Sequence, residues 1–349
     1  MSIDFNLFKK LSETPGAPGF EKPIRDVVIG EIQNHVDSYE IDNLGNLICF
    51  KKGHSSQAVM AAAHLDEIGF IVSHIDDDGF ISFHTLGGFD PKTLTAQRVF
   101  VHGKKDLLGV MGTKPIHVMT AEERSKAPKK EDYFIDLGMS KAEVEEFISI
   151  GDPITREREF VEMGNCVNGK SIDNRVAVYI LIETIKKLSG KEIPNDFYAV
   201  FTVQEEVGIR GANVSAHAIN PQFGIAIDTT IAYDLPSAKG NEKITSLGKG
   251  TAIKVMDGMT ICDTRMVKYM KELAEKNNIP YQLELLPAGG TDTAGLQRMG
   301  KTGAIAGAVS IPTRNLHQVI EMANKDDIAW SVELLTLCLT NLNNFNWAH

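Results

Sequence analysis

Two adjacent glutamates, Glu205 and Glu206, stand between an apolar run and a glycine-punctuated segment in the stretch VFTVQEEVGIRGA, residues 200–212. An apolar run of this length bounded by glycine is typical of a buried strand. The end of such a strand, where the chain enters a helix, is where open α/β sheets place their reactive groups. Two carboxylates at that position call for a neighbouring cation, so the stretch indicates a cation site.

Other acidic and imidazole side chains follow apolar runs in the same way. His64 and Asp66 end the run AVMAAAHLD, Asp228 ends IAID, Asp173 begins DNRVAVY, and His317 lies in IPTRNLHQ. Each residue alone is more typical of a turn or a helix cap than of a functional group. Because the ends of parallel strands converge on one rim of a sheet, their recurrence predicts that these side chains share one crevice.

Several carboxylates in one crevice raise one another's pKa, and divalent cations would relieve the repulsion. Carboxylate and imidazole ligands without thiolates favour zinc, cobalt or manganese over calcium and magnesium. Two divalent ions bring four positive charges, which three carboxylates and a bridging hydroxide would balance. We therefore expect Asp173 to bridge two ions, with His64 and Asp228 on one ion and Glu206 and His317 on the other.

The two neighbouring glutamates should then have different roles. Adjacent residues on an extended strand point to opposite sides, so both are not expected to bind the same ion equivalently unless the chain turns between them. If Glu206 binds metal, Glu205 remains free near the bridging water as a general base that passes the proton to the leaving group. Asp66 lies on the same side of the strand as His64, so we expect it to orient that imidazole through its second nitrogen.

The segments that carry these residues predict an α/β fold. From residue 171 onward, helix-like and strand-like runs alternate, which predicts a mixed, largely parallel sheet with helices on both faces. Before that, short alternating runs separated by Gly and Asp turns indicate a small β domain. We expect an α/β catalytic domain of residues 1–69 and 168–349, interrupted by an inserted β domain of residues 70–167.

Charge and cysteine usage narrow the class of protein. The chain has 36 Lys and Arg against 46 Asp and Glu, a formal charge of −10, which argues against nucleic acid or an anionic membrane as a partner. Its 4 cysteines are far apart, so neither a thiolate zinc site nor a disulfide framework is indicated. No apolar stretch reaches the ~18 residues of a membrane span. We expect a cytoplasmic protein.

Six motifs, in order and spacing, resemble the glutamyl and deblocking aminopeptidase family of dinuclear metallopeptidases: HLDEIGF, DNR, QEEVGIRGA, IAIDTT, GGTDTAG and RNLHQ. The resemblance covers essentially the whole chain and implies removal of N-terminal residues from short peptides. It implies two divalent ions per subunit, zinc or cobalt, with Glu205 as catalytic base supported by Asp66. The ligands that it implies are His64, Asp173, Glu206, Asp228 and His317. It also implies a homo-oligomer that forms dimers through the inserted domain and then a tetrahedral dodecamer.

Two alternative functions are compatible with these residues. A dinuclear site could hydrolyse N-acyl amino acids, because a fold does not fix its substrate. The chain could also be a non-catalytic, metal-stabilised binding or assembly protein. Glycoside hydrolysis fits less well because it normally requires two free carboxyl groups, whereas most of the carboxylates here are expected to hold metal.

Overall fold

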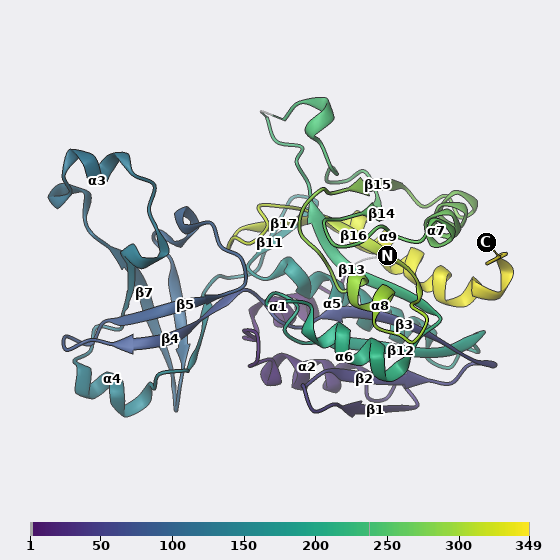
Figure 1. Cartoon of the computed structure of the whole chain (residues 1–349), viewed down its shortest axis with the longest axis horizontal. Helices are drawn as coiled ribbons and strands as arrows, with labels where there is room; N and C mark the ends of the chain where they lie inside the picture. The colour runs from purple at the N-terminus through teal and green to yellow at the C-terminus, as the bar shows by residue number, and fades with distance from the viewer. Residues whose placement is uncertain (1–2, 237, 349) are drawn as a thin grey trace.

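A computed structural model describes residues 3–236 and 238–348 of the chain. These residues form an α/β body around an eleven-stranded sheet and a smaller lobe built on a closed six-stranded barrel. Figure 1 shows the two parts beside each other, with the barrel lobe on the left and both ends of the chain in the α/β body.

The centre of the large sheet is parallel. β3 (Ser55–His64) lies between β12 (Asn195–Thr202) and β13 (Phe223–Ile231), and β13 also pairs with β16 (Ile305–Arg314), all in parallel. Antiparallel strands extend the sheet beyond β12 and beyond β16, and a further pair joins β16 at its side. These outer strands are β1 (Ser38–Ile41), β2 (Leu47–Lys51), β10 (Val161–Met163), β11 (Cys166–Gly169), β14 (Thr251–Met256), β15 (Tyr281–Leu285) and β17 (Glu321–Asn324).

The expected mixed sheet is confirmed, but it is less parallel than expected. Six of its ten strand pairings are antiparallel. Alternation of helix and strand along the sequence reveals the strands joined by crossover helices, which run parallel. It does not reveal how short additional strands are added at the edges, because that pairing is decided by contacts distant in sequence.

Helices cover both faces of the large sheet. α6 (Arg210–Ile219) and α8 (Thr293–Arg298) contact one face, in front of the strands in Figure 1. The core of the opposite face is built with α1 (Phe5–Glu13), α2 (Lys22–Ile32), α5 (Ile172–Leu188), α7 (Thr264–Lys276) and α9 (Lys325–Asn341). Because successive side chains of a strand point to opposite faces, β3 gives Ala61 and Ala63 to the larger core and Met60 and Ala62 to the smaller one.

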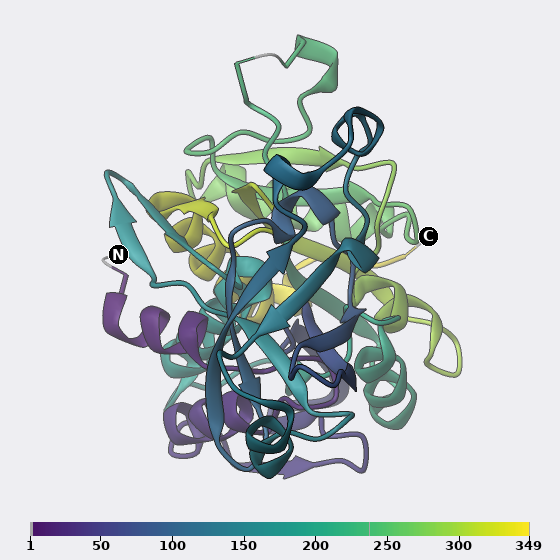
Figure 2. The ribbon, with the colours of Figure 1, turned by 90° about the vertical axis from the view of Figure 1, so that its left-hand side faces the viewer.

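The barrel has a hydrophobic core of its own, and its strands follow the order β4-β5-β8-β7-β6-β9 around the closed sheet. Figure 2 views the molecule from the barrel side. The short helix α4 (Lys141–Phe147) begins with a capping box, in which the Ser140 backbone N–H donates to Glu143 at 2.8 Å. The strands are β4 (Gly69–Ile75), β5 (Ile81–Leu86), β6 (Arg98–His102), β7 (Asp106–Thr113), β8 (Tyr133–Asp136) and β9 (Pro153–Arg156).

The barrel strands end earlier than the expected insert, which extended to residue 167. After β9 ends at Arg156, β10 and β11 pair with each other, and β11 pairs with β17 in the large sheet. Short strand-like runs have the same texture in either sheet, so the sequence could not reveal the sheet to which they belong.

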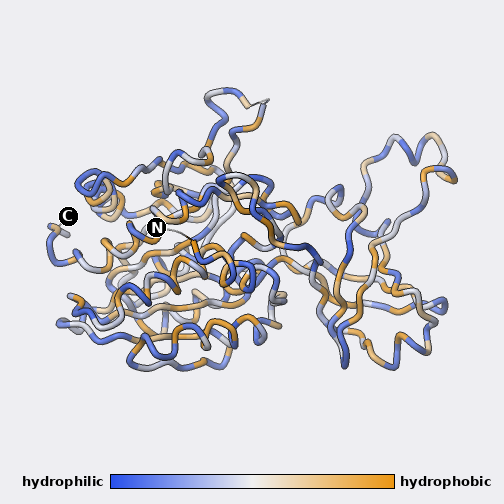
Figure 3. The backbone as a smooth tube through the Cα atoms, turned by 180° about the vertical axis from the view of Figure 1, so that it is seen from behind, coloured by the Kyte–Doolittle hydropathy of each residue, from blue (hydrophilic) through white to orange (hydrophobic). Residues whose placement is uncertain are grey.

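In Figure 3 hydrophobic segments run through the interior of the α/β body. No described helix is both long enough and apolar enough to cross a membrane.

A buried guanidinium joins the N-terminal segment, β3 and α5. Arg175 is fully buried, and its Nε donates to the Leu65 carbonyl at 2.9 Å. Its Nη1 donates to the carbonyl of Thr14 at 2.7 Å. The Glu67 carboxylate lies 3.7 Å from Nη2 of Arg175 and also accepts from Lys170, so the buried charge is compensated. This network fixes the chain directly beside His64.

Replacing Arg175 with methionine should destabilise the fold, because the carbonyls of Leu65 and Thr14 would lose their donor and the buried Glu67 a positive partner. We expect the free energy of unfolding to fall by about 3–5 kcal/mol in urea titrations. The control is Arg158→Met, an exposed arginine, which should change it by less than about 0.5 kcal/mol. Equal stability of the two variants would show that the Arg175 network is not a structural support.

Candidate active site

The structure brings all the predicted site residues together at the carboxyl ends of the central parallel strands. His64 ends β3, Asp228 lies in β13, and Asp173 lies in the first turn of α5. Glu205 and Glu206 follow β12, and His317 lies between β16 and β17. All six line one cavity of about 520 Å³, and Asp66 lies directly behind it.

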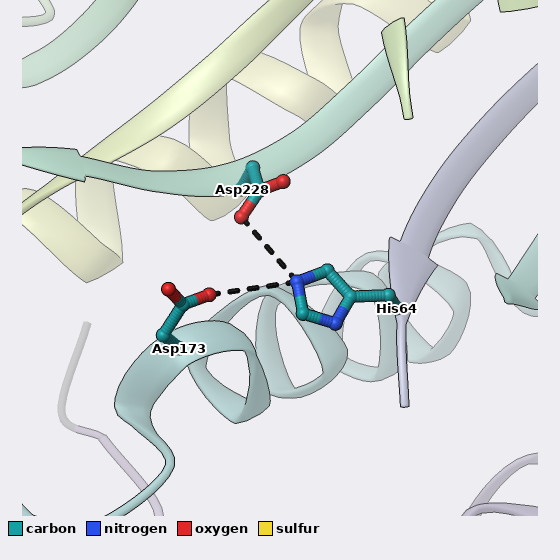
Figure 4. Close-up of side chains that lie close together, drawn as sticks. All are labelled: His64, Asp173 and Asp228. Carbon is teal, nitrogen blue, oxygen red and sulfur yellow. Dashed lines mark ion pairs between the residues drawn. The ribbon is translucent and has the colours of Figure 1, made fainter. Parts of the chain in front are cut away.

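The first group of side chains is centred on His64. Its Nε2 lies 3.5 Å from Oδ1 of Asp173 and 3.7 Å from Oδ1 of Asp228. Figure 4 shows the imidazole directed at both carboxylates, which approach it from α5 and β13. All three side chains are buried. Burial alone would lower the pKa of His64, but these carboxylates outweigh it and raise the pKa well above its ordinary value.

The second group shares Asp173 with the first. Nε2 of His317 lies 3.3 Å from Oδ2 of Asp173 and 3.7 Å from Oε2 of Glu206. The two carboxylate oxygens of Asp173 therefore face different imidazoles. Burial would lower the pKa of His317, yet the carboxylates of Asp173 and Glu206 raise it to about 10.

The atoms in each group are spaced as ligands of one ion would be. Within each group the candidate ligand atoms lie within 4.8 Å of one another. Tetrahedral zinc with bonds of about 2.0–2.1 Å keeps neighbouring ligands about 3.3 Å apart. The closest pairs here are near that separation and longer than ordinary hydrogen bonds between nitrogen and oxygen. Oε1 of Glu206 is also buried without a hydrogen-bond partner. Both donor sets could therefore hold a metal ion.

Glu205 lies beside both groups. Its Oε2 is 3.9 Å from Nε2 of His64, and burial raises the pKa of its carboxyl group well above the ordinary value. The two glutamates do not lie on an extended strand, because β12 ends at Thr202, and of the two expected possibilities the chain takes the turn. The chain turns here: the N–H groups of Gly208 and Ile209 donate to the Glu205 carbonyl at 3.0 and 2.8 Å. It is this turn that directs the two side chains differently.

Asp66 lies against the second nitrogen of His64 and also contacts the turn that follows β12. Its main-chain carbonyl, 3.0 Å from Nδ1 of His64, is the nearer acceptor for that imidazole. Its carboxylate is 3.5 Å from the same nitrogen and instead accepts the backbone N–H groups of Glu205 and Glu206, each at 3.0 Å. Asp66 therefore fixes the turn that carries both glutamates.

Two further acidic residues belong to the site. The carboxylate of Glu321, which sequence reasoning missed, accepts the N–H of Asp173 at 2.9 Å and the N–H of His317 at 2.8 Å. Asp292 accepts a hydrogen bond from the Thr202 hydroxyl at 2.5 Å, and burial raises its pKa to about 7. Asp292 ends the GGTD part of the GGTDTAG motif, and the first three residues of that motif line the cavity. No sequence signal distinguished Glu321.

Comparison with known proteins identifies the family. Residues 45–334 match the model of the M42 glutamyl aminopeptidase family, and the chain belongs to that family. It is 40% identical to a putative aminopeptidase of Acetivibrio thermocellus, over 95% of this chain and 97% of the relative.

Solved structures agree in fold over nearly the whole chain. An aminopeptidase from the archaeon Desulfurococcus kamchatkensis superposes with a TM-score of 0.92 at 38% identity, covering 96% of this chain and 94% of the other. The TET1 peptidase of Pyrococcus horikoshii superposes with a TM-score of 0.86 at 32% identity, covering 96% of this chain and 98% of the other. That peptidase is described as assembling into a tetrahedron or a large octahedral shell. The protein is therefore an aminopeptidase, a hydrolase of a metal-dependent family.

The titration of the site predicts how pH affects the metal-free protein. Burial, with the charge of Asp173 adding to it, raises the pKa of Glu206 and of Glu321 from 4.5 to about 8. Above pH 4.5 the folded protein thus keeps protons that the unfolded chain has lost, so rising pH lowers its stability up to about pH 8. His317 acts in the same direction, because its contribution to the stability of the fold is complete below pH 6.5 and is lost as the pH rises through about 10.

In the presence of a chelator, we expect the free energy of unfolding to fall between about pH 5.5 and pH 8, by on the order of 3 kcal/mol for each of these two carboxyl groups. Glu206→Gln should flatten this dependence. Saturating zinc should oppose it, because metal ions bind the deprotonated ligands more tightly as pH rises. A metal-free protein that becomes more stable across this range would contradict the assigned titration. Urea titrations at a series of pH values provide the measurement.

Proposed function

We propose that the chain is an aminopeptidase with two divalent ions, zinc or cobalt. His64 and Asp228 would hold one ion, Glu206 and His317 the other, and Asp173 both. The observation that carries this assignment is the position of Asp173, whose two carboxylate oxygens face two different imidazoles at 3.5 and 3.3 Å. When bound, the ions would polarise the scissile carbonyl and lower the pKa of the attacking water.

The chain's own residues would supply the proton transfer. Glu205 lines the cavity beside Nε2 of His64 and belongs to neither candidate ligand set. Its carboxylate would take the proton of the attacking water and deliver it to the departing amine. Burial keeps that carboxylate dry and its proton affinity high, while the hydrogen bond from its backbone N–H to Asp66 holds it in position.

The charge of the cavity supports a substrate with a free N-terminus. Besides the proposed ligands, the buried carboxyl groups of Glu205 and Asp292 lie near the same site. A protonated amine is attracted to such surroundings, whereas the neutral amide and terminal carboxylate of an N-acyl amino acid gain nothing from them. The acidic excess therefore favours aminopeptidase over acylase activity.

The side-chain pocket favours neutral residues over acidic ones. Lys254 is the single Lys or Arg among the described residues lining the cavity, and it is fully buried between Asp257 and Glu284, each at 3.0 Å. A cation matched by two carboxylates does not offer a free charge to an acidic substrate. The apolar side chains Ile231, Met259, Leu286 and Leu316 also line the cavity.

The oligomeric state and location also belong to this proposal. We assign residues 1–69 and 168–349 to the catalytic domain and propose that the insert within residues 70–167, whose barrel strands end at Arg156, mediates dimer formation within a tetrahedral dodecamer. Support comes from the described assembly of the Pyrococcus horikoshii relative. The exposed apolar residues Leu108, Val110, Ile116 and Val118 of the barrel lobe provide a surface for such contacts. The four unpaired cysteines are compatible with the cytoplasm.

Exchanging each of the two neighbouring glutamates tests their different roles. Glu205→Gln should lower kcat by at least about 10²-fold with both ions retained, because the general base is lost. Glu206→Gln should instead lower the metal content. Metal content by mass spectrometry and turnover of a peptide substrate are measured on the same samples, with exposed Glu272→Gln as control. Near-normal turnover of fully loaded Glu205→Gln would exclude Glu205 as the base.

A matched set of substrates tests the chemistry and the pocket together. Metal-loaded protein should release single residues from free peptides but not from their acetylated counterparts, and a chelator should abolish the release. We expect kcat/KM for an N-terminal leucine to exceed that for glutamate by at least about tenfold, since a buried, matched Lys254 gives an acidic side chain no partner. Cleavage of N-acetyl amino acids alone would favour the acylase function. Full metal loading without hydrolysis would favour the non-catalytic alternative.

A further inference from the structure

The two imidazoles of the site are oriented by different parts of the chain. Nδ1 of His64 bonds to the carbonyl of Asp66, two residues away in the same segment. Nδ1 of His317 lies 2.9 Å from the carbonyl of Gly88, which belongs to the barrel lobe just after β5. With Nδ1 donating to Gly88, Nε2 is the nitrogen of His317 that faces Asp173 and Glu206 and that would bind an ion.

A second contact from the barrel lobe reaches the backbone of the same histidine. Arg156, the last residue of β9, donates from Nη1 to the carbonyl of His317 at 3.1 Å. Arg156 is 2% exposed, and the negative charges facing it are Glu321, Glu67, Glu206 and Asp173. Its guanidinium therefore brings a positive charge from the barrel to the acidic side of the site.

The barrel lobe holds Arg156 through its aromatic residues. The guanidinium lies 5.5 Å from the centre of the Phe89 ring. The Phe89 ring stacks on that of Phe70 in β4, with the ring centres 4.6 Å apart. Phe89 directly follows Gly88, so one short segment provides both the ring beneath Arg156 and the carbonyl that faces Nδ1 of His317. The two contacts to His317 thus belong to one structural unit.

The backbone of His317 needs such support. It adopts a left-handed conformation with φ of 61°. Residues other than glycine rarely adopt this conformation, and it persists only where surrounding contacts fix it. Those contacts are the N–H to Glu321, the carbonyl to Arg156 and the ring to Gly88. Two of the three come from the barrel lobe. His64, in contrast, lies at the end of an interior strand of the large sheet.

We propose that the barrel lobe positions His317, so that tight binding of the ion at Glu206 and His317 requires Arg156 and Gly88, whereas binding at His64 and Asp228 does not. This inference rests on the proposed two-ion site. It makes Arg156 a positioning residue that acts through the His317 loop. One of the two ions then becomes dependent on contact between the barrel and the α/β body.

The test compares ion binding in full-length Arg156→Met and wild-type protein. Metal-free protein is titrated with Co²⁺, with calorimetry giving the affinity of each ion and visible absorption reporting its coordination. In Arg156→Met we expect one ion to bind 10–100-fold more weakly, the usual effect of losing a partner that orients a ligand, and the other to change less than twofold. Arg156→Lys should recover part of the loss, and exposed Arg158→Met should match the wild type.

The weakened ion is identified with His317→Ala, which should lose the same ion. Adding Arg156→Met to His317→Ala should not weaken the remaining ion further. If Arg156→Met fails to fold, as judged by its unfolding midpoint, Phe89→Leu removes the ring beneath the guanidinium and is expected to weaken the same ion.

Unchanged affinities, or equal weakening of both ions, in a folded variant would overturn the proposal. A wild-type protein that binds fewer than two ions would instead overturn the two-ion site on which the proposal rests.

Discussion

Mutual repulsion among buried carboxyl groups is the constraint on which the rest of this structure depends. Asp173, Glu205, Glu206, Asp228 and Glu321 lie close together in surroundings that raise the pKa of most of them. His64, His317 and Arg156 face them with positive charge. A fold that concentrates carboxylates in this way is stable at neutral pH when protons or metal ions compensate the charge. The arrangement is thus suited to binding metal, and without metal it lowers the stability of the fold.

The acidic residues that support the site accept hydrogen bonds from the main chain. Asp66 accepts the N–H groups of Glu205 and Glu206, and Glu321 accepts those of Asp173 and His317. Such bonds fix the backbone from which a reactive side chain extends. They also use N–H groups near the turn and the helix start that regular structure leaves unpaired. Support of the backbone and the proposed metal binding and catalysis are therefore assigned to two sets of carboxylates of the same chemical type.

The site also unites two lobes that have separate hydrophobic cores. The α/β body provides every proposed ligand, whereas the barrel lobe contacts the backbone and the ring of His317. An insert that served oligomerisation alone would not need a buried arginine at this boundary. Whatever contacts the barrel lobe can therefore influence the chemistry of the cavity through Arg156, although the lobe itself contributes no ligand.

The sequence by itself determined the chemical types at the site and much of the framework. Apolar runs ending in Asp, Glu or His predicted which side chains would meet, and Asp173 is indeed shared between the two groups. It also predicted the mixed sheet, because hydrophobic periodicity is a local property of the chain. The same local information overestimated the parallel character of the sheet and the extent of the strand before Glu205.

Only the tertiary structure decided the roles that depend on distant partners. The turn at Glu205 is held by Asp66, 139 residues away, and the carbonyl of His317 is held by Arg156, 161 residues away. Glu321 and Arg156 have ordinary sequence surroundings and become important only where folding buries them. A hydrogen bond between remote segments leaves no periodic trace in the sequence, so its partners are fixed by packing.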